Sequence, residues 1–538
     1  MTTTAGADRD TQRLENLGYR QELSRVLGFF DNFSVAFTYL SPVVGIYSLF
    51  AFGLGSGGPA SIWLMPIVVI GMLFVALVFG ELASHYPVAG SLYQYSKFTV
   101  GPNYGWWVGW FYGVALLITV ASVDTGVAPY VATLFNNWFN TSIDATKHST
   151  ILIITLSLLA VQTAANILGT RVLGRVARYG TYVETFGTFG IFIILLIAGF
   201  HHGLGYLFNT ENVQHSASNP LGFDFSGNWL LGAALVAILA HVYIFYGFES
   251  AGDIAEETKD AGRQIPRAMR SALVYGGVSS FVLVAALILA IPKGGFDDAV
   301  SGGPAFVLGA NLTPWIEDVL LAVVIYAFFS CGSSVQGAGA RLAFSYGRDG
   351  AVPGGRWLSH VSRRFRTPVN ALLLGFIVPA LFSFLVNVTP SEDKKFGFIT
   401  YPADVNALVV LVSFATSGIY LSFLLTVIGS AIARRRGWKP AGSFTLGRWG
   451  WTVTWLGGGY LSVMFLNIIW PSALDSGRGF INLGWITLTV MVLIAVVGAI
   501  VWLFARPAAR IAEHLTDSEA ELPAQRHAQH DTAMPQET

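Results

Sequence analysis

The sequence predicts an all-α integral membrane protein with twelve transmembrane helices. Hydrophobic residues make up 53% of the 538 residues and charged residues only 12%, and the mean hydropathy is +0.57. A soluble domain carries about 25% charged residues, so the composition excludes an ordinary soluble protein. Apolar stretches that recur along the chain approach the roughly 20 residues that cross a bilayer as a helix.

Each expected span is an apolar stretch bounded by polar or charged residues, and little chain remains between neighbouring spans. Two of them, the first and the sixth, are interrupted and are treated separately below. The expected spans are 28–52, 61–84, 104–135, 150–169, 179–200, 229–256, 269–291, 315–345, 369–388, 404–430, 450–471 and 480–504.

The distribution of basic residues predicts the orientation. If the N-terminus is cytoplasmic, all but five of the 31 lysines and arginines fall in cytoplasmic segments. The positive-inside rule therefore places both termini in the cytoplasm. The five exceptions are Lys147, Lys293, Lys394, Lys395 and Arg478.

The polar ends of the chain are expected to be tails. Residues 1–26 and 506–538 are expected to form cytoplasmic N- and C-terminal tails on either side of the twelve-helix domain at 27–505. Within these tails, 2–9 and 513–538 are expected to be disordered. The first 26 residues hold no apolar stretch, so the first helix is expected to direct insertion. The basic runs 363–366 and 433–439 are expected to set topology and to contact lipid headgroups.

The sixth span contains the most informative feature of the chain. Residues 229–245 are apolar, but the sequence then reads YGFESAGD from Tyr246 to Asp253. A glycine and two carboxylates at membrane depth predict a broken helix, and such backbone is tolerated only where it lines a cavity or binds something. Interrupted helices of this kind indicate the binding site of a secondary transporter.

The first span carries a second predicted interruption. Pro42 and Gly45 lie in mid-span, and proline removes a hydrogen bond from the helical ladder. The inner half is expected to end near 39–41 and the outer half to begin near 44–45. The two breaks fall in the first helix of each of two five-helix halves, as an inverted repeat requires.

Four passages occur in order along the chain: SPVVGIYSLF (41–50), FGELASHYPVAGSLYQYSK (79–97), FYGFESAGDIAEETKDAGRQIPRAM (245–269) and ARLAFSYGRDGAVP (340–353). Together they resemble the amino acid–polyamine–organocation (APC) superfamily of permeases. Within that superfamily, ASVDTGVA (121–128) in the third span is similar to the amino acid/choline transporter branch.

The resemblance implies a LeuT-like five-plus-five inverted repeat with broken helices 1 and 6. The repeats would cover about 28–200 and 229–430, and two extra helices at about 450–504 would lie outside them. It further implies a permease that imports an amino acid or related amine by alternating access.

The breaks supply groups for a zwitterionic amino acid. Amides at a half-helix N-terminus attract a carboxylate, which makes the amides of Val43, Val44 and Gly45 the carboxylate candidates, while Ser41 could add a hydroxyl. Carbonyls near 245–246, where the outer half of helix 6 ends, could hold the ammonium beside Gly247. Aromatic walls are expected from Tyr243, Tyr246 and Phe248, although such residues also serve as packing.

Three acidic residues lie within expected spans, where a charged side chain is energetically costly, so each is a candidate for a functional role. Glu249 follows the helix 6 break and could face substrate or position the helix. Asp124 in helix 3 could hold a cationic group or simply pack against a neighbour. Glu184 in helix 5, expected about 10 Å from the start of the helix, matches the place where some proton-coupled relatives keep a titratable group. A buried carboxyl favours its neutral form, so Glu184 is the proton-coupling candidate, with a structural hydrogen bond as the alternative.

Ser333 and Ser334 in helix 8 are the competing coupling candidates. Two adjacent hydroxyls and helix 1 carbonyls could hold sodium, although serines also pack helices together in membranes.

The predicted function is a proton-coupled permease of the cell membrane. The alternatives are a sodium-coupled symporter, an exchanger of choline, polyamine or 4-aminobutyrate, or a non-transporting sensor. No enzyme motif is present, and no cofactor, metal or nucleic-acid partner is expected. The expected partners are the small-molecule substrate, a co-transported proton or sodium ion, and lipid.

Overall fold

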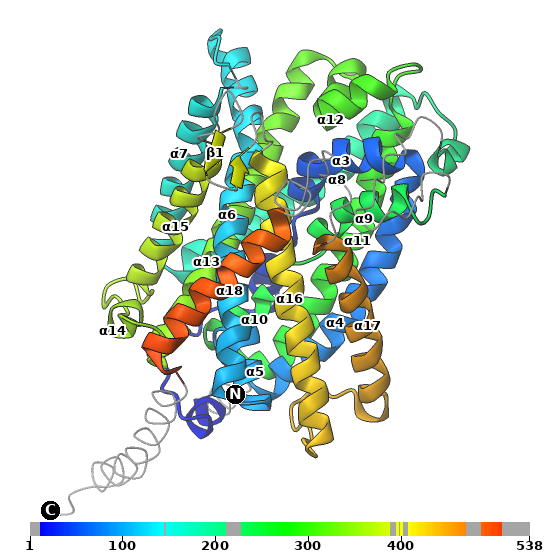
Figure 1. Ribbon diagram of the computed structural model, residues 1–538. Helices are drawn as coiled ribbons and strands as arrows, with labels where there is room; N and C mark the ends of the chain where they lie inside the picture. The colour runs from blue at the N-terminus through cyan, green and yellow to red at the C-terminus, as the bar shows by residue number, and fades with distance from the viewer. Residues whose placement is uncertain are drawn as a thin grey trace, which may run out of the picture.

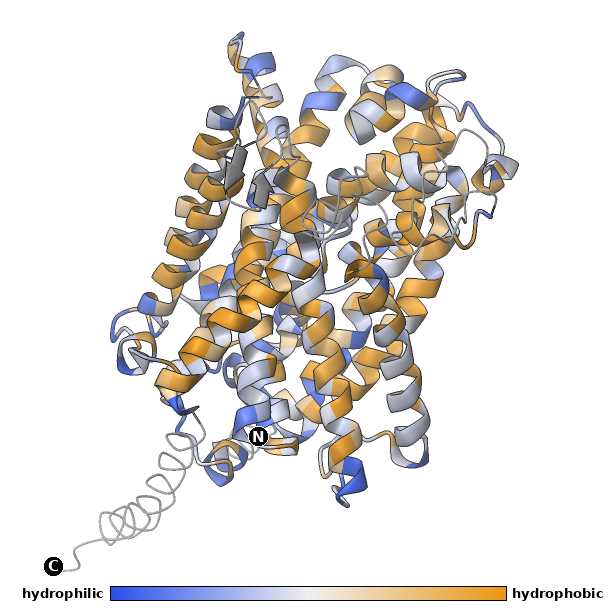
Figure 2. Cartoon of the chain, in the orientation of Figure 1, coloured by the Kyte–Doolittle hydropathy of each residue, from blue (hydrophilic) through white to orange (hydrophobic). Residues whose placement is uncertain are grey.

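The computed structural model describes residues 11–144, 147–210, 228–387, 394–396, 399–401, 407–469 and 486–507. The segments expected to be disordered, 2–9 and 513–538, lie outside the described residues. The described chain is a bundle of long helices, with hydrophobic residues along most of their length (Figures 1 and 2).

Within the described ranges, eleven segments are long and apolar enough to cross a membrane. This confirms the all-helical membrane architecture. In chain order they are α2 (Phe29–Leu40) with α3 (Pro42–Gly57), η1 (Pro59–Trp63) with α4 (Leu64–His85), α6 (Pro102–Phe139), α7 (His148–Ile167), α8 (Thr170–Ala198), α11 (Ala261–Leu289), α13 (Pro314–Arg348), α15 (Val369–Asn387), α16 (Ala407–Arg435), α17 (Gly450–Ile469) and α18 (Ile486–Ala505).

The sixth expected span is not one continuous helix. It forms α9 (Ala233–Ile244), which has 12 residues, and the single turn α10 (Ser250–Asp253). Neither piece alone reaches the roughly 20 residues that a span requires. The count of twelve spans therefore stays a prediction.

The start of α8 differs most from its expected boundary. The helix begins at Thr170, nine residues before the expected 179. Its first turns carry the basic residues that indicated a loop, and arginine is a good helix former. Glu184 consequently lies about 21 Å along the helix at 1.5 Å per residue, rather than about 10 Å.

Short elements that the sequence analysis did not predict occupy the connections. They are α5 (Ser91–Thr99), η2 (Leu204–Phe208), η3 (Ala255–Glu257), α12 (Phe296–Asn311), α14 (Gly355–Leu358), β1 (Lys394–Phe396), β2 (Ile399–Tyr401) and η4 (Gly447–Trp449). β1 and β2 are the only strands among the described residues, and they pair antiparallel with Lys394 facing Tyr401.

The two interrupted helices lie inside the bundle. α2 packs against α8, α11 and α13, while α3 runs along α9. α6 packs against both α13 and α16, and α17 and α18 lie at the periphery against α4, α16 and α6 (Figure 1). The chain therefore brings both helix interruptions into its buried centre.

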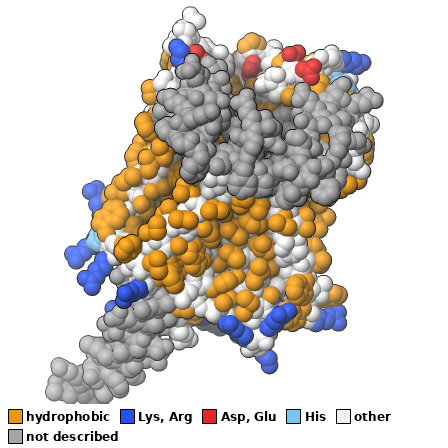
Figure 3. Space-filling view, in the orientation of Figure 1, with side chains coloured by type: hydrophobic (Ala, Val, Ile, Leu, Met, Phe, Trp, Pro, Cys, Tyr) orange, Lys and Arg blue, Asp and Glu red, His pale blue; other side chains and the backbone are white. Residues whose placement is uncertain are grey.

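Charged side chains lie at the two ends of the bundle. In Figure 3, most of the Lys and Arg side chains in view lie along the lower edge of a hydrophobic band, while the acidic side chains in view lie at the upper edge together with a few basic ones. The described N-terminal segment and the end of α18 both lie at the basic end. Tyr19 contacts Asp349 just after α13, and the Trp502 indole donates to Asn103 at the start of α6, 3.3 Å away.

Candidate functional site

The break in the first span is confined to one residue, Ser41. Its backbone takes φ 35° and ψ 93°, which ends α2 and starts α3 at Pro42. The Ser41 hydroxyl caps α3 by accepting a hydrogen bond from the Val44 amide at 3.2 Å. Proline fits the first helical position because its missing N–H would be unpaired there anyway. The outer half therefore begins two to three residues earlier than expected.

The second break is longer and depends on Gly247. α9 ends at Ile244, and Gly247 takes φ 110°, a conformation that residues with a side chain rarely adopt. The Glu249 carboxylate accepts a hydrogen bond from the Gly247 amide at 2.8 Å, and the Ser250 hydroxyl donates one to the Gly247 carbonyl at 2.7 Å. Glu249 therefore stabilises the broken backbone directly.

The two breaks touch each other. A Cβ placed on Gly247 would lie 2.7 Å from the Leu40 nitrogen and 2.9 Å from the Tyr39 carbonyl carbon. A Cβ on Gly45 would lie 2.5 Å from the Ile244 side chain. Each glycine thus lets the backbone of one broken helix approach the other.

Glu184 on α8 reaches this junction. The Ser41 hydroxyl donates to its carboxylate at 2.8 Å. The carboxyl group is fully buried, and its second oxygen has no hydrogen-bond partner among the described residues. One carboxyl group therefore contacts the residue that interrupts helix 1.

The amides expected to bind a carboxylate are not equally available. The Val44 amide binds the Ser41 hydroxyl, and the Gly45 amide binds the Ser41 carbonyl at 3.1 Å. The Val43 amide has no backbone acceptor and faces the Glu184 carboxylate instead, so none of the three amides is free in this arrangement. The Glu184 carboxyl group lies at this same helix N-terminus, through its bond to Ser41.

The predicted aromatic residues divide into two groups. Tyr246 packs edge-on against Tyr39, with ring centroids 5.9 Å apart, and against Tyr243 at 5.6 Å. These rings lie at the junction of the breaks. Phe248 instead contacts Phe79 and Phe423, on α4 and α16.

Asp124 on α6 is hydrogen-bonded to residues of α7. Gln162 on α7 donates to one of its carboxylate oxygens at 2.7 Å, and the Thr155 hydroxyl donates to its backbone carbonyl at 3.2 Å. This geometry is that of the alternative in which Asp124 packs helix 3 onto a neighbour.

The two serines of α13 point to different partners. The Ser333 hydroxyl donates to the Phe329 carbonyl of its own helix at 2.7 Å. The Ser334 hydroxyl lies 2.9 Å from that of Thr38 on α2. Ser334 therefore joins helices 1 and 8, whereas the Ser333 hydroxyl faces its own backbone.

Sequence reasoning missed several polar residues at the junction. Tyr112 on α6 donates to Asp253 at 2.8 Å and contacts Glu249 at 3.4 Å. The Cys331 thiol donates to the Tyr39 carbonyl at 3.4 Å, at the end of α2. Asp253 is one of the two carboxylates noted at the sixth-span break, but it was given no role, although it lies four residues after Glu249. Tyr112 and Cys331 carry no local sequence signal.

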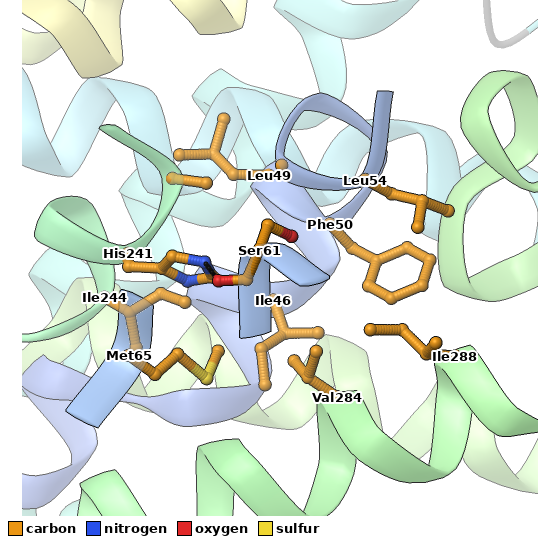
Figure 4. Close-up of a pocket in the computed structure, with 12 residues that line it drawn as sticks. Ile46, Leu49, Phe50, Leu54, Ser61, Met65, His241, Ile244, Val284 and Ile288 are labelled. Atoms are coloured by element: carbon orange, nitrogen blue, oxygen red, sulfur yellow. Dashed lines mark hydrogen bonds between the residues drawn. The ribbon is translucent and has the colours of Figure 1, made fainter. Parts of the chain in front are cut away.

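A small cavity lies one turn from the breaks, between α3, α4, α9 and α11. It measures about 20 Å³ and is lined mostly by aliphatic side chains, with His241 at one side (Figure 4). A ring nitrogen of His241 lies 2.9 Å from the Ser61 carbonyl. A cavity of this size holds about one water molecule.

At the basic end, the N-terminal segment closes over a buried ion pair. The Lys97 ammonium lies 2.6 Å from the Asp349 carboxylate, and the Tyr19 hydroxyl donates to the same carboxylate at 2.8 Å. Burial lowers the pKa of Lys97, although Asp349 opposes this shift. Burial alone would raise the pKa of Asp349, but Lys97 and Arg348 outweigh it and lower that pKa.

The same N-terminal segment is bound to the chain that follows α10. The Val26 and Leu27 amides both donate to the Glu257 carbonyl at 2.9 Å. Glu257 forms a fully buried two-point ion pair with Arg341, at 2.9 and 3.0 Å. The inner end of the broken helix is therefore held by main-chain and ionic contacts together.

Among the described residues, no group of three or more His, Cys, Asp or Glu side chains is placed to hold a metal ion. The polar groups at the breaks are instead hydroxyls, carboxyl groups and exposed backbone, which suit an organic ligand with hydrogen-bonding and charged groups.

Comparison with known proteins agrees with this architecture. The family model described as amino acid permease matches residues 27–497. The chain is 28% identical to the amino-acid permease BAT1 of Arabidopsis thaliana, over 84% of this chain and 86% of that protein. It is 22% identical to the GABA-specific permease of Saccharomyces cerevisiae, over 92% and 83%.

A third relative shows that named substrates vary among similar proteins. The chain is 26% identical to the thiamine transporter thi9 of Schizosaccharomyces pombe, over 71% of this chain and 69% of that protein. The family match covers both broken helices and all but the ends of the chain. The chain therefore belongs to the amino acid permease family of the APC superfamily, and is a multi-pass membrane transporter rather than an enzyme.

Proposed function

We propose that this protein imports an amino acid or related amine across the cell membrane by proton-coupled alternating access. The observation that carries the proposal is the contact between Glu184 and Ser41, because it joins a buried carboxyl group to the interruption of helix 1. A change in the protonation of Glu184 would change this hydrogen bond and with it the cap on α3.

The substrate's ammonium is proposed to bind near the end of α9. The Phe245 and Tyr246 carbonyls lie past the last helical residue and accept no hydrogen bond from the described residues. Carbonyls at a half-helix C-terminus carry partial negative charge. Tyr39, Tyr243 and Tyr246 form the aromatic surroundings of this position.

The substrate's carboxylate, if it has one, is proposed to replace the Glu184 carboxylate at the Val43 amide. Glu184 lies at the same helix end, and two carboxylates there would repel each other unless one is protonated. Binding of a carboxylate substrate would therefore favour protonated Glu184, which links substrate to proton. A substrate with no carboxylate would leave Glu184 free to pair with its cationic group.

A ligand panel tests the substrate. Purified protein would be screened by thermal shift against amino acids, 4-aminobutyrate, choline, polyamines and thiamine, because relatives bear several of these names. Hits would then be measured as uptake into proteoliposomes with and without an inward proton gradient. A ligand that binds but is never transported would favour the sensor alternative.

Glu184→Gln tests coupling. The variant keeps the size and hydrogen-bonding capacity but cannot titrate, so uphill accumulation should fall to the level without a proton gradient, while exchange between loaded vesicles persists. Glu184→Asp is the control, because it retains a titratable carboxyl group and should retain gradient dependence. Accumulation by Glu184→Gln equal to wild type contradicts the proposal.

Sodium coupling is the second candidate, favoured by the contact between Thr38 and Ser334. Hydroxyls from helices 1 and 8 could contribute oxygen ligands to a hard cation. If uptake requires sodium and Ser334→Ala abolishes it while Ser333→Ala does not, sodium replaces the proton in the mechanism.

A further inference from the structure

A second cavity lies far from the helix breaks, at the basic end of the bundle. It measures about 310 Å³ and is formed where the N-terminal segment, the α7–α8 junction and the loop before α15 meet. It is lined by Ser24, Val26, Leu168, Gly169, Thr170, Arg171, Arg364, Phe365 and Arg366. We propose that this cavity binds the phosphate group of an anionic phospholipid.

Three arginines provide the charge. The side chains of Arg171, Arg364 and Arg366 are exposed, and none pairs with a carboxylate within the described chain. Nearby arginines behave differently, since Arg178 pairs with Asp31 and Arg341 with Glu257. Guanidinium groups bind phosphate with charge-assisted, often two-point hydrogen bonds. Three of them in one cavity, unneutralised, favour an anion.

The backbone adds further donors. α8 begins at Thr170, and neither the Thr170 nor the Arg171 amide has a backbone acceptor among the described residues. The first amides of a helix are unpaired within it, and the helix dipole is positive at this end. The loop at 362–367 is stabilised by two internal backbone hydrogen bonds. The Arg366 amide donates to the Ser362 carbonyl at 2.8 Å, and the Ser362 amide donates to the Thr367 carbonyl at 2.9 Å. Arg364 and Arg366 are thereby held beside the helix end.

The depth of the cavity selects a lipid over a soluble anion. α7 ends at Ile167, α8 starts at Thr170 and α15 starts at Val369, so three membrane-spanning helices end at this level. Basic side chains gather at the same edge, below the hydrophobic band (Figure 3). Basic pockets between helices at the cytoplasmic surface are suited to anionic headgroups.

Two large apolar side chains line the cavity together with the arginines. Leu168 is 58% exposed although it lies directly between two spanning helices, and Phe365 also contributes to the lining. A free phosphate ion would gain nothing from these side chains, whereas the glycerol and first methylenes of a phospholipid would cover them. The combination of arginines and apolar side chains matches an amphiphile.

The cavity walls connect to the inner end of the broken helix. The Val26 amide donates to the Glu257 carbonyl at 2.9 Å, and the Thr170 hydroxyl donates to the Glu257 carboxylate. A headgroup that binds both the N-terminal segment and the start of α8 would therefore stabilise the contacts that both segments make with Glu257. Bound lipid should therefore stabilise the folded protein by mass action.

The test uses the purified, delipidated full-length chain in detergent. Phosphatidylglycerol and phosphatidylcholine with identical acyl chains would be titrated, with bound lipid counted by native mass spectrometry and the thermal midpoint recorded. Wild type should bind phosphatidylglycerol at least about tenfold more tightly, since one charged hydrogen bond contributes about 1.5–3 kcal/mol. Arg171→Gln/Arg364→Gln/Arg366→Gln should lose this preference.

A matched variant separates the cavity from general charge. Arg435→Gln/Lys439→Gln/Arg448→Gln removes three exposed cations from the end of α16 and its connection to α17, and it should keep the preference. Equal losses in the two triple variants, or preference retained in both, overturn the proposal. Because a triple variant can fail to fold, Arg364→Gln alone is also measured, with an expected loss of about threefold; no loss in this properly folded variant also counts against it.

Inorganic phosphate distinguishes the two sources of the anion. At constant ionic strength, millimolar phosphate should neither displace phosphatidylglycerol nor raise the thermal midpoint of the wild type. If phosphate alone reproduces the stabilisation, and the pocket variant abolishes it, the cavity is a site for a soluble anion and the lipid assignment is wrong.

Discussion

Replacing Gly247 with alanine should separate the two broken helices. Gly247 takes φ 110°, and an added Cβ would lie 2.7 Å from the Leu40 nitrogen and 2.9 Å from the Tyr39 carbonyl carbon. Both atoms belong to backbone at the end of α2, so neither can rotate away as a side chain could. Gly247→Ala must therefore move one helix relative to the other.

The magnitude has two parts. A side chain at positive φ costs about 1–2 kcal/mol, and overpacking against rigid neighbours costs about 1–3 kcal/mol more. Gly199 provides a matched control, because it has φ 97° but nothing within 4 Å of an added Cβ. Gly199→Ala shares the first cost alone, so the difference between the two variants isolates the contact between the breaks.

The assay compares the variants in thermal unfolding and in substrate uptake by proteoliposomes, at equal reconstituted amounts. A difference of about 1–3 kcal/mol corresponds to a roughly 5- to 150-fold change in the population of the closely packed arrangement. Gly247→Ala should retain at most about a fifth of wild-type uptake, while Gly199→Ala stays near wild type. Equal stability and uptake in the two alanine variants would refute the reasoning.

Three further predictions concern the basic end and the orientation. Arg341→Met should lower the apparent melting temperature strongly, because an unpaired buried Glu257 costs about 3–5 kcal/mol of folding free energy. The double variant Arg341→Met/Glu257→Gln should recover most of this loss, and no recovery would mean that Arg341 acts by packing. Asp349→Asn should lower the apparent melting temperature, because it leaves the buried Lys97 ammonium without its carboxylate partner. Burial lowers the pKa of Lys97, so folding favours the neutral amine, and the difference in melting temperature from wild type should shrink as pH rises from 7 to 9. A difference that does not change with pH would exclude this charge effect. In a Cys331→Ser background, cysteines at Thr141 and Lys439 should react with an impermeant reagent from outside and inside the cell respectively, and labelling of both from one side would contradict the topology.

The sequence by itself determined the class of the protein and the approximate place of its spans. Apolar length, low charge and the bias of basic residues act along the chain, so they can be read without tertiary contacts. The interruption near Gly247 was predictable for the same reason, because a glycine and carboxylates at membrane depth cannot continue a lipid-facing helix. Pro42 in mid-span predicted the interruption of helix 1, and the family resemblance implied the same break.

Boundaries were less predictable, because basic residues at a helix end look like loop residues in a sequence. α8 thus began at Thr170 rather than near 179, which also changed the depth of Glu184. In the same way, α3 began at Pro42, because the Ser41 hydroxyl could cap it.

Only the tertiary structure decided which candidate residues meet. Glu184 and Ser41 are 143 residues apart in sequence and hydrogen-bonded in space, while Asp124 turned toward Gln162 and Phe248 toward Phe79 and Phe423. The direction of a side chain around a buried helix depends on the neighbours packed against it, and those neighbours come from distant segments. The same reason explains the arginine-lined cavity, whose walls come from three separate parts of the chain.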